Sequence, residues 1–267
     1  MSVLFFSSFA CALGAIMGSF LNVVIRRGYR EQSFGGRSHC ETCKKELSVK
    51  ELIPIFSFLI QKGRCRFCGA VLSWQYPLVE FSTGIAYAIA ARLLLPRDIF
   101  QITFLDSVYL LSAFVGIAAA IVVLVSDIRY QIIPNGSALT LIIVGITASI
   151  LRVASSASPY TMLWDAGGAA AASLILWSLW RVSRGTWIGL GDVKLIFATS
   201  LIVGFTRAIP AFFFAFWIGG LIGILLLLFR RATPKTSIPF GPFILAGAFA
   251  ALCTARFIPD LFLLQLF

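Results

Sequence analysis

Eight apolar stretches, separated by short polar segments, run along most of the chain. They cover residues 3–25, 77–95, 107–126, 137–153, 165–180, 192–206, 209–229 and 239–257. A helix of about 20 apolar residues crosses the hydrocarbon core of a bilayer. The stretch 165–180 is the weakest, because it is short, rich in Gly and Ala, and depends on Trp177 and Trp180 as interface anchors. The pattern predicts an all-α polytopic membrane protein with about eight transmembrane helices.

The composition supports this class, because 59% of the residues are hydrophobic, only 12% are charged, and the mean hydropathy is +0.94. The only long polar stretch follows the first apolar stretch. We therefore expect three parts: a first transmembrane helix at 1–25, a polar module at 26–76, and a seven-helix membrane body at 77–267.

The basic residues predict the orientation of the chain. Ten of them lie in the polar module, and alternate loops place seven more on the same side of the membrane, which makes 17 of 22. Cytoplasmic loops carry an excess of Lys and Arg, so the module is predicted to be cytoplasmic and both termini to lie outside. The seven in the loops are Arg129, Arg181, Arg184, Lys194, Arg230, Arg231 and Lys235.

Two further expectations follow from the charges. The first apolar stretch is not a cleaved signal peptide, because its basic residues follow the apolar run. The net charge of +11 reflects this topology and an attraction to anionic lipid head groups, and it does not indicate nucleic acid binding.

Four cysteines form two C-x-x-C pairs in the polar module: Cys40 with Cys43, and Cys65 with Cys68. Two such pairs supply the four thiolates of a tetrahedral zinc site. The alternative, two disulfides, requires an oxidising compartment. Because the module is predicted to be cytoplasmic, a structural Zn²⁺ site is favoured.

His39 is the single histidine and directly precedes Cys40. Four cysteines already complete a zinc shell, so we expect His39 to be solvated or to lie outside the ligand set. One histidine also excludes an H-E-x-x-H metalloprotease.

Carboxylates near hydrocarbon are costly and usually functional. Four of the eleven acidic residues lie in the polar module, where we expect them to be solvated surface residues: Glu31, Glu41, Glu46 and Glu51. Four more (Asp98, Asp106, Asp165 and Asp260) fall at predicted outer helix ends or loops, where capping or hydration explains them. This leaves Glu80, Asp127 and Asp192. Glu80 lies just inside the second span, where an ion pair with the basic module is as reasonable as a functional role.

Asp127 and Asp192 are both predicted at the cytoplasmic ends of their helices. Asp127 is followed by Arg129, and Pro134 and Asn135 end one helix and cap the next. Asp192 follows Gly189 and Gly191 and precedes Lys194, and the glycines allow another backbone to approach closely.

Two aspartates at the same depth can share a proton, so that one acts as base and the other as acid. That is the chemistry of an aspartic protease with a membrane-embedded substrate. The alternatives for each residue are a helix cap or an ion pair with Arg129 or Lys194.

Taken in order, the motifs resemble those of the type IV prepilin peptidases, bifunctional leader peptidase/N-methyltransferases. They are GSFLNV at 18–23, RSHCETC at 37–43, GRCRFCG at 63–69, YPLVE at 76–80, DIRYQIIPN at 127–135, GLGDVK at 189–194 and PFGP at 239–242. Many members carry proline where Glu41 stands here, which bears on the turn at the metal site and not on catalysis.

The resemblance implies that Asp127 and Asp192 are the catalytic pair, in a site shaped by Arg129, Pro134, Asn135, Gly189, Gly191, Lys194 and Glu80. It implies cleavage of the basic leader of a prepilin or pseudopilin, of type IV pili or type II secretion, at the cytoplasmic face of the bacterial inner membrane. It further implies that S-adenosylmethionine methylates the new N-terminal amine, a function associated with the module. No cofactor-binding residue can be named from the sequence, because no segment has the glycine-rich pattern of a cofactor loop.

A second class of function is a polytopic transporter or assembly scaffold with a zinc module for docking. In that case Asp127 and Asp192 would be proton or cation sites. The G-x-G-D context of Asp192, and the lack of polar or basic partners deep in other spans, argue against it.

Overall fold

The computed structural model describes residues 3–33, 35–96, 101–156, 160–231, 233 and 236–257. Lys235, Asp98 and Asp260 lie outside these residues. The chain forms two compact units, Met1–Val122 and Val123–Phe267. The three-part division expected from the sequence stays a prediction, and the two units are described separately.

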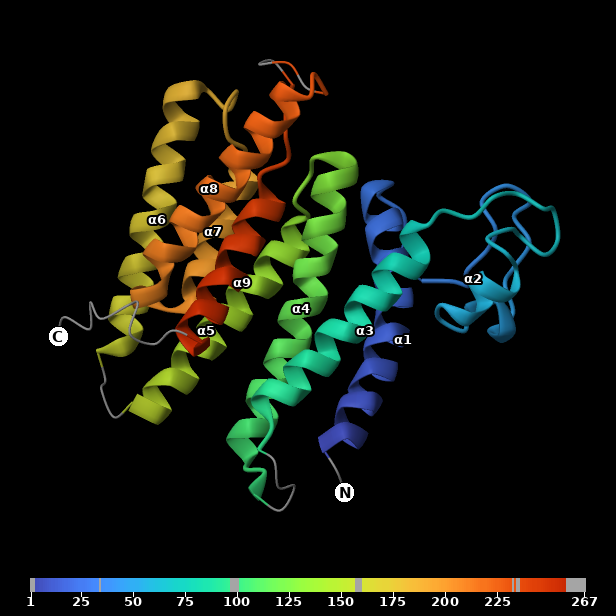
Figure 1. The fold of residues 1–267 in the computed structure, drawn as a ribbon, viewed down its shortest axis with the longest axis horizontal. Coiled ribbons are helices and arrows are strands. Elements are labelled where there is room, and N and C mark those ends of the chain that lie inside the picture. The colour runs from blue at the N-terminus through green and yellow to red at the C-terminus, as the bar shows by residue number, and fades with distance from the viewer. Residues whose placement is uncertain are drawn as a thin grey trace. The chain divides into compact units, whose positions relative to one another are not determined.

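Helices account for nearly all of the regular structure (Figure 1). They are α1 (Val3–Tyr29), the 3₁₀ helix η1 (Val49–Leu52), α2 (Phe56–Ile60), α3 (Gln75–Leu94), α4 (Phe104–Tyr130), α5 (Asn135–Ser156), α6 (Thr161–Ser183), α7 (Leu190–Val203), α8 (Phe205–Leu228) and α9 (Gly241–Phe257). Within the described residues, β-structure is limited to two isolated bridges. One helix corresponds to each predicted apolar stretch, so the predicted all-α class is confirmed.

Six of the helices are long and apolar enough to cross a membrane: α1, α3, α4, α5, α6 and α8. The helix α7 has only 14 residues, which is about 21 Å, and the apolar part of α9 is also short. The protein is a multi-pass membrane protein, and the number of eight spans stays a prediction.

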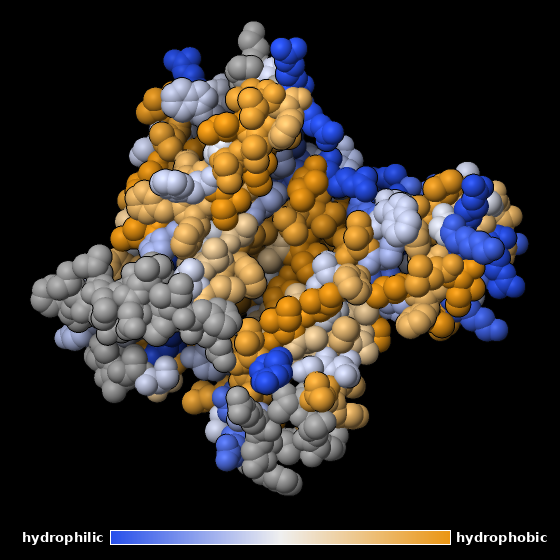
Figure 2. All heavy atoms as spheres, in the orientation of Figure 1, coloured by the Kyte–Doolittle hydropathy of each residue, from blue (hydrophilic) through white to orange (hydrophobic). Residues whose placement is uncertain are grey.

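Large apolar side chains cover the outer surfaces of the helices. Phe9 is 63% exposed, Trp217 75% and Leu221 60%. Figure 2 shows orange hydrophobic residues along the helices, while blue hydrophilic residues gather over the segment that carries α2. Exposing so many apolar side chains to water is costly, whereas the hydrocarbon of a bilayer can cover them.

The first unit is built on close packing of α1 against α3. A methyl group at Gly18 would lie 2.6 Å from Cα of Glu80, and one at Gly14 would lie 2.6 Å from the carbonyl oxygen of Thr83. Small residues four positions apart allow membrane helices to approach this closely. Asn22, which is 1% exposed, also joins the two helices, because its Nδ2 donates to the carbonyl oxygen of Tyr76 at 3.2 Å.

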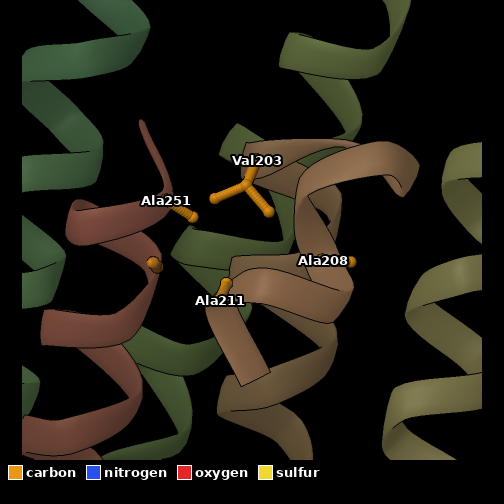
Figure 3. Packing of buried hydrophobic residues seen from close by; sticks show 5 residues of the cluster. Val203, Ala208, Ala211 and Ala251 are labelled. Carbon is orange, nitrogen blue, oxygen red and sulfur yellow. The ribbon is translucent and has the colours of Figure 1, made fainter. Parts of the chain in front are cut away.

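The second unit is organised around α7, which contacts α5, α6, α8 and α9 (Figure 1). Its residues Leu195 and Ala198 are fully buried. Small residues bring the helices together at the end of α7, where Figure 3 shows Val203 facing Ala251 of α9, with Ala211 of α8 beside them. A short helix surrounded in this way is held mainly by packing.

The chain breaks between α7 and α8 at Gly204, which has φ of +86°. The sequence-based ends of these two stretches, at 206 and 209, were therefore wrong by a few residues. The polar Thr206 and Arg207 led hydropathy to place the break a few residues late. The helix ends at Gly204 because a positive φ ends a helix and favours glycine.

A buried ion pair fixes this break. Arg152 donates to Oδ2 of Asp165 from Nε at 2.9 Å, and its Nη atoms donate to the carbonyl oxygens of Leu201 and Ile202 at the end of α7. Asp165 is 3% exposed, and its Oδ1 accepts the N–H of Phe205 at 2.8 Å. The pair therefore caps the end of α7 and the start of α8 at once. Capping or hydration was expected for Asp165; the structure shows a buried cap, and its ion pair with Arg152 was not expected.

Replacing Arg152 with Met should lower the free energy of unfolding by about 3–5 kcal/mol, because Asp165 would stay buried and charged without its partner. Unfolding of the purified protein in detergent measures this. Arg207→Met is the matched control, since Arg207 makes no ion pair with any described residue. The control should change the free energy by less than about 0.5 kcal/mol. Equal losses in both variants would contradict the assigned role of Arg152.

Candidate active site and cysteine cluster

Asp127 lies near the end of α4 and is 5% exposed. Its Oδ2 accepts the N–H of Gly241 at 2.8 Å. Gly241 is the first residue of α9, so the carboxylate caps the N-terminus of a helix that is far away in sequence. The partial positive charge of a helix N-terminus favours an anion at this position.

Asp192 lies in the first turn of α7 and is 9% exposed. Its Oδ2 accepts the N–H of Gly189 at 3.0 Å. Both aspartates are thus held through Oδ2 by a backbone N–H at the start of a helix. Within the described residues, Oδ1 of each carboxylate accepts no hydrogen bond.

Ile133 connects the surroundings of the two acids. A methyl group at Gly191 would lie 2.9 Å from its Cβ, and one at Gly241 would lie 3.5 Å from its Cδ1. The starts of α7 and α9 therefore meet on the same side chain. Asp127 and Asp192 are close enough to interact electrostatically. The structure brings these two residues together, as the sequence analysis expected, and their catalytic role stays a prediction.

The other residues expected to shape the site have different positions. Lys194 Nζ donates to Oδ1 of Asn135 at 2.8 Å, so it joins the starts of α7 and α5. Pro134 directly precedes α5, and Arg129 is exposed in the last turn of α4. Glu80 belongs to the first unit, where it lies in α3.

The sequence motifs predicted no role for Gly241 or Ile133 themselves. Both stand inside motifs that carried the resemblance, PFGP and DIRYQIIPN. Gly241 stands at the predicted start of the last apolar stretch, which could have drawn attention to it. No local pattern, however, shows that the N–H of Gly241 reaches Asp127.

The four cysteines of the polar module form one cluster. Their Sγ atoms all lie within 4.8 Å of one another, and Sγ of Cys40 is 3.9 Å from Sγ of Cys68. A tetrahedral site with metal–sulfur distances of about 2.3 Å has sulfur–sulfur edges of about 3.8 Å. The cluster therefore fits one metal ion and could hold it.

Two similar turns position these thiols. In one, the N–H of Lys44 donates to the carbonyl oxygen of Cys40, and in the other the N–H of Gly69 donates to that of Cys65. Lys44 and Gly69 both have positive φ. The backbone N–H of Cys43 is the main cause that lowers the pKa of Cys40 to about 6, which favours the thiolate that a metal requires.

His39 and Glu41 lie beside the cluster without joining it. Nδ1 of His39 is 3.4 Å from the carbonyl oxygen of Arg37, and His39 pairs with Glu46 in an isolated bridge. Glu41 forms ion pairs with Arg26 and Arg30 at the end of α1. The acid that replaces the usual proline therefore ties the first turn of the cluster to α1.

Comparison with known proteins agrees with these features. Residues 12–93 match the bacterial peptidase A24 N-terminal domain, and residues 114–224 match the type IV leader peptidase family. The prepilin leader peptidase/N-methyltransferase of Bacillus subtilis is 35% identical over 241 residues, which cover 89% of this chain and 90% of the relative. The chain belongs to the prepilin leader peptidase/N-methyltransferase family.

Other family members are similar over comparable lengths. The Klebsiella pneumoniae relative of the same name is 33% identical over 76% of this chain and 87% of its own length. The Myxococcus xanthus relative is 30% identical over 86% of this chain and 66% of its own length. No solved structure matches the chain. The family resemblance expected from the motifs is thus confirmed.

The cluster should hold about one metal ion per chain, and Cys40→Ser should remove it, because three thiolates bind the ion much more weakly than four. Elemental analysis of the purified proteins measures the metal content. Cys253→Ser is the matched control, since Cys253 is a free cysteine outside the cluster. Full metal content in the Cys40→Ser protein would place the ligands elsewhere.

Proposed function

We propose that this protein is an aspartic endopeptidase that removes the basic leader of type IV prepilins or pseudopilins at the cytoplasmic face of the inner membrane. One observation carries the proposal: two buried aspartates are each held at Oδ2 by a backbone N–H at the start of a helix, and both helix starts meet on Ile133. The names of the relatives support the choice of substrate.

Two neighbouring carboxylates cannot both ionise readily, so the pair shares one proton. The ionised member takes a proton from a water molecule, whose oxygen attacks the scissile carbonyl carbon. The protonated member donates a hydrogen bond to the carbonyl oxygen and stabilises the charge that develops there. The C–N bond then breaks as the carbonyl re-forms, and the leaving amine nitrogen takes the proton that the first carboxylate removed from water. The bound N–H groups fix both carboxylates before the substrate arrives, which supplies part of the positioning that catalysis requires.

The position of the acids suits a substrate that enters from a membrane. Asp127 lies at the end of an apolar helix of 27 residues, and Asp192 begins the short helix α7. A membrane-embedded prepilin with a basic leader would present its cleavage site at the boundary of the bilayer. In the orientation predicted by the basic residues, this boundary is the cytoplasmic one, and both termini lie outside.

The polar module carries the second half of the proposal. We assign Zn²⁺ to the four cysteines as a structural ion, because four thiolates in reducing cytoplasm are its usual ligand set. The module, at 26–76, would serve methylation, and the body from 77 onward would serve cleavage. S-adenosylmethionine, when bound, supplies the methyl group for the new N-terminal amine. The full names of the relatives support this activity.

Asp127→Asn and Asp192→Asn should each reduce cleavage of a prepilin by a factor of at least about 10³, because an amide keeps the shape but cannot take part in proton transfer. Incubation of the purified variants with intact prepilin in detergent, followed by mass spectrometry, measures this. Asp106→Asn is the control, since Asp106 caps the start of α4. Wild-type rates in either variant would remove that aspartate from the catalytic pair, whereas no cleavage by the unmodified protein would favour a transporter or scaffold over a peptidase.

Gly241→Ala should reduce the cleavage rate by about a factor of 10², since the added methyl group would lie 2.6 Å from Oδ2 of Asp127 and displace the carboxylate. Thermal unfolding should change little, because the displaced atom ends a side chain. Gly220→Ala is the matched control, with nothing within 4 Å of its added methyl group. Equal rates in both variants would show that the hydrogen bond to Gly241 does not position Asp127.

A further inference from the structure

A cavity of about 290 Å³ lies in the first unit, between the cysteine module and the ends of α1 and α3 next to it. Its wall includes three arginines and three glutamates, together with apolar and aromatic side chains such as Phe58 and Leu72. This volume is at the lower end of the range for small-molecule sites, about 300–1,000 Å³. The proposed peptidase chemistry uses none of these residues.

Glu80 is the distinctive group of this wall. It is 6% exposed, its Oε2 accepts the N–H of Ile55 at 2.7 Å, and the hydroxyl of Ser19 also bonds to its carboxylate. No basic side chain of the described residues lies within ion-pair distance of it. A buried carboxylate without a counterion is costly, so the cavity offers a place where a cation would be stabilised.

The remaining charges of the wall are already engaged. Glu41 pairs with Arg26 and Arg30, and Glu51 pairs with Arg66. The guanidinium of Arg27 donates to backbone carbonyl oxygens between Ser33 and Arg37. The cavity thus presents one unpaired negative group among fixed charges of both signs. That arrangement suits a small ligand with a localised positive charge, whereas the arginines would repel a polybasic peptide.

We propose that this cavity binds S-adenosylmethionine, with the carboxylate of Glu80 facing the positive part of the ligand. The choice of ligand rests on the proposed methyltransferase function. The apolar and aromatic part of the wall would receive the adenosyl group, and the sulfonium and ammonium groups supply the positive charge that Glu80 lacks. The Ile55 N–H and the Ser19 hydroxyl hold the carboxylate in place.

Two variants of the full-length protein test the site in different ways. Glu80→Gln removes the charge but keeps an oxygen for the Ile55 N–H. Ser57→Phe puts a large side chain into the cavity and keeps the carboxylate of Glu80; Ser57 lines the cavity and makes no side-chain hydrogen bond to a described residue. The matched controls are Glu46→Gln and Leu59→Phe, since both residues are exposed in the same module and lie outside the wall.

Equilibrium binding of radiolabelled S-adenosylmethionine to the purified proteins in detergent is the measurement. Both variants should weaken binding by at least about tenfold, because a hydrogen-bonded charge or the ligand's space is lost. Both controls should bind as the wild type does. Unchanged affinity in Glu80→Gln, or in Ser57→Phe, would overturn the proposal. A raised KM for prepilin cleavage with unchanged S-adenosylmethionine affinity would also overturn it and would make the cavity a leader-binding site.

The binding assay separates this proposal from the peptidase proposal. Asp192→Asn protein should bind S-adenosylmethionine with wild-type affinity while it fails to cleave prepilin. Binding that depends on Glu80 in a protein without any peptidase activity would support the cavity and refute the peptidase. Efficient cleavage by a wild-type protein that binds no S-adenosylmethionine would do the reverse.

Discussion

The hydrogen bond from the Gly241 N–H to Asp127 is the contact on which the candidate active site depends. It fixes the end of α4 to the start of α9, and it requires glycine, because any Cβ at 241 would meet the carboxylate. Ile133 then brings the start of α7, with Asp192, to the same place. A chemically reactive pair is therefore positioned by backbone groups, which cost no side-chain entropy to hold and do not titrate.

The C-terminal end of α7 is also fixed by specific contacts. Arg152 and Asp165 cap the ends of α7 and α8 around Gly204, and small residues pack the adjoining turns (Figure 3). Since α7 has only 14 residues, contacts at its two ends and the packing between them set where Asp192 lies. A buried ion pair is a costly device, and its use here is consistent with a need to place one short helix accurately.

The first unit contains a small polar module that has little apolar core to stabilise it. The four cysteines gather its two turns around one point, and Glu41 ties the first turn to Arg26 of α1 and to Arg30 just after it. Between the module and the helices, the structure leaves a cavity with an unpaired carboxylate. In a membrane protein, such a group is expected to have a function, because an apolar or paired side chain would be more stable there.

The sequence by itself determined the helical class, the positions of eight apolar helices to within a few residues, the family, and the cysteine cluster, because hydropathy and ligand spacing are local patterns. It also singled out Asp127 and Asp192, whose catalytic role stays a prediction. Only the tertiary structure decided which backbone group holds each acid, since Gly241 is 114 residues away from Asp127. The same holds for the partner of Asp165 and for the lack of a basic partner at Glu80. Each of these depends on which helices meet, and no local pattern of residues contains that information.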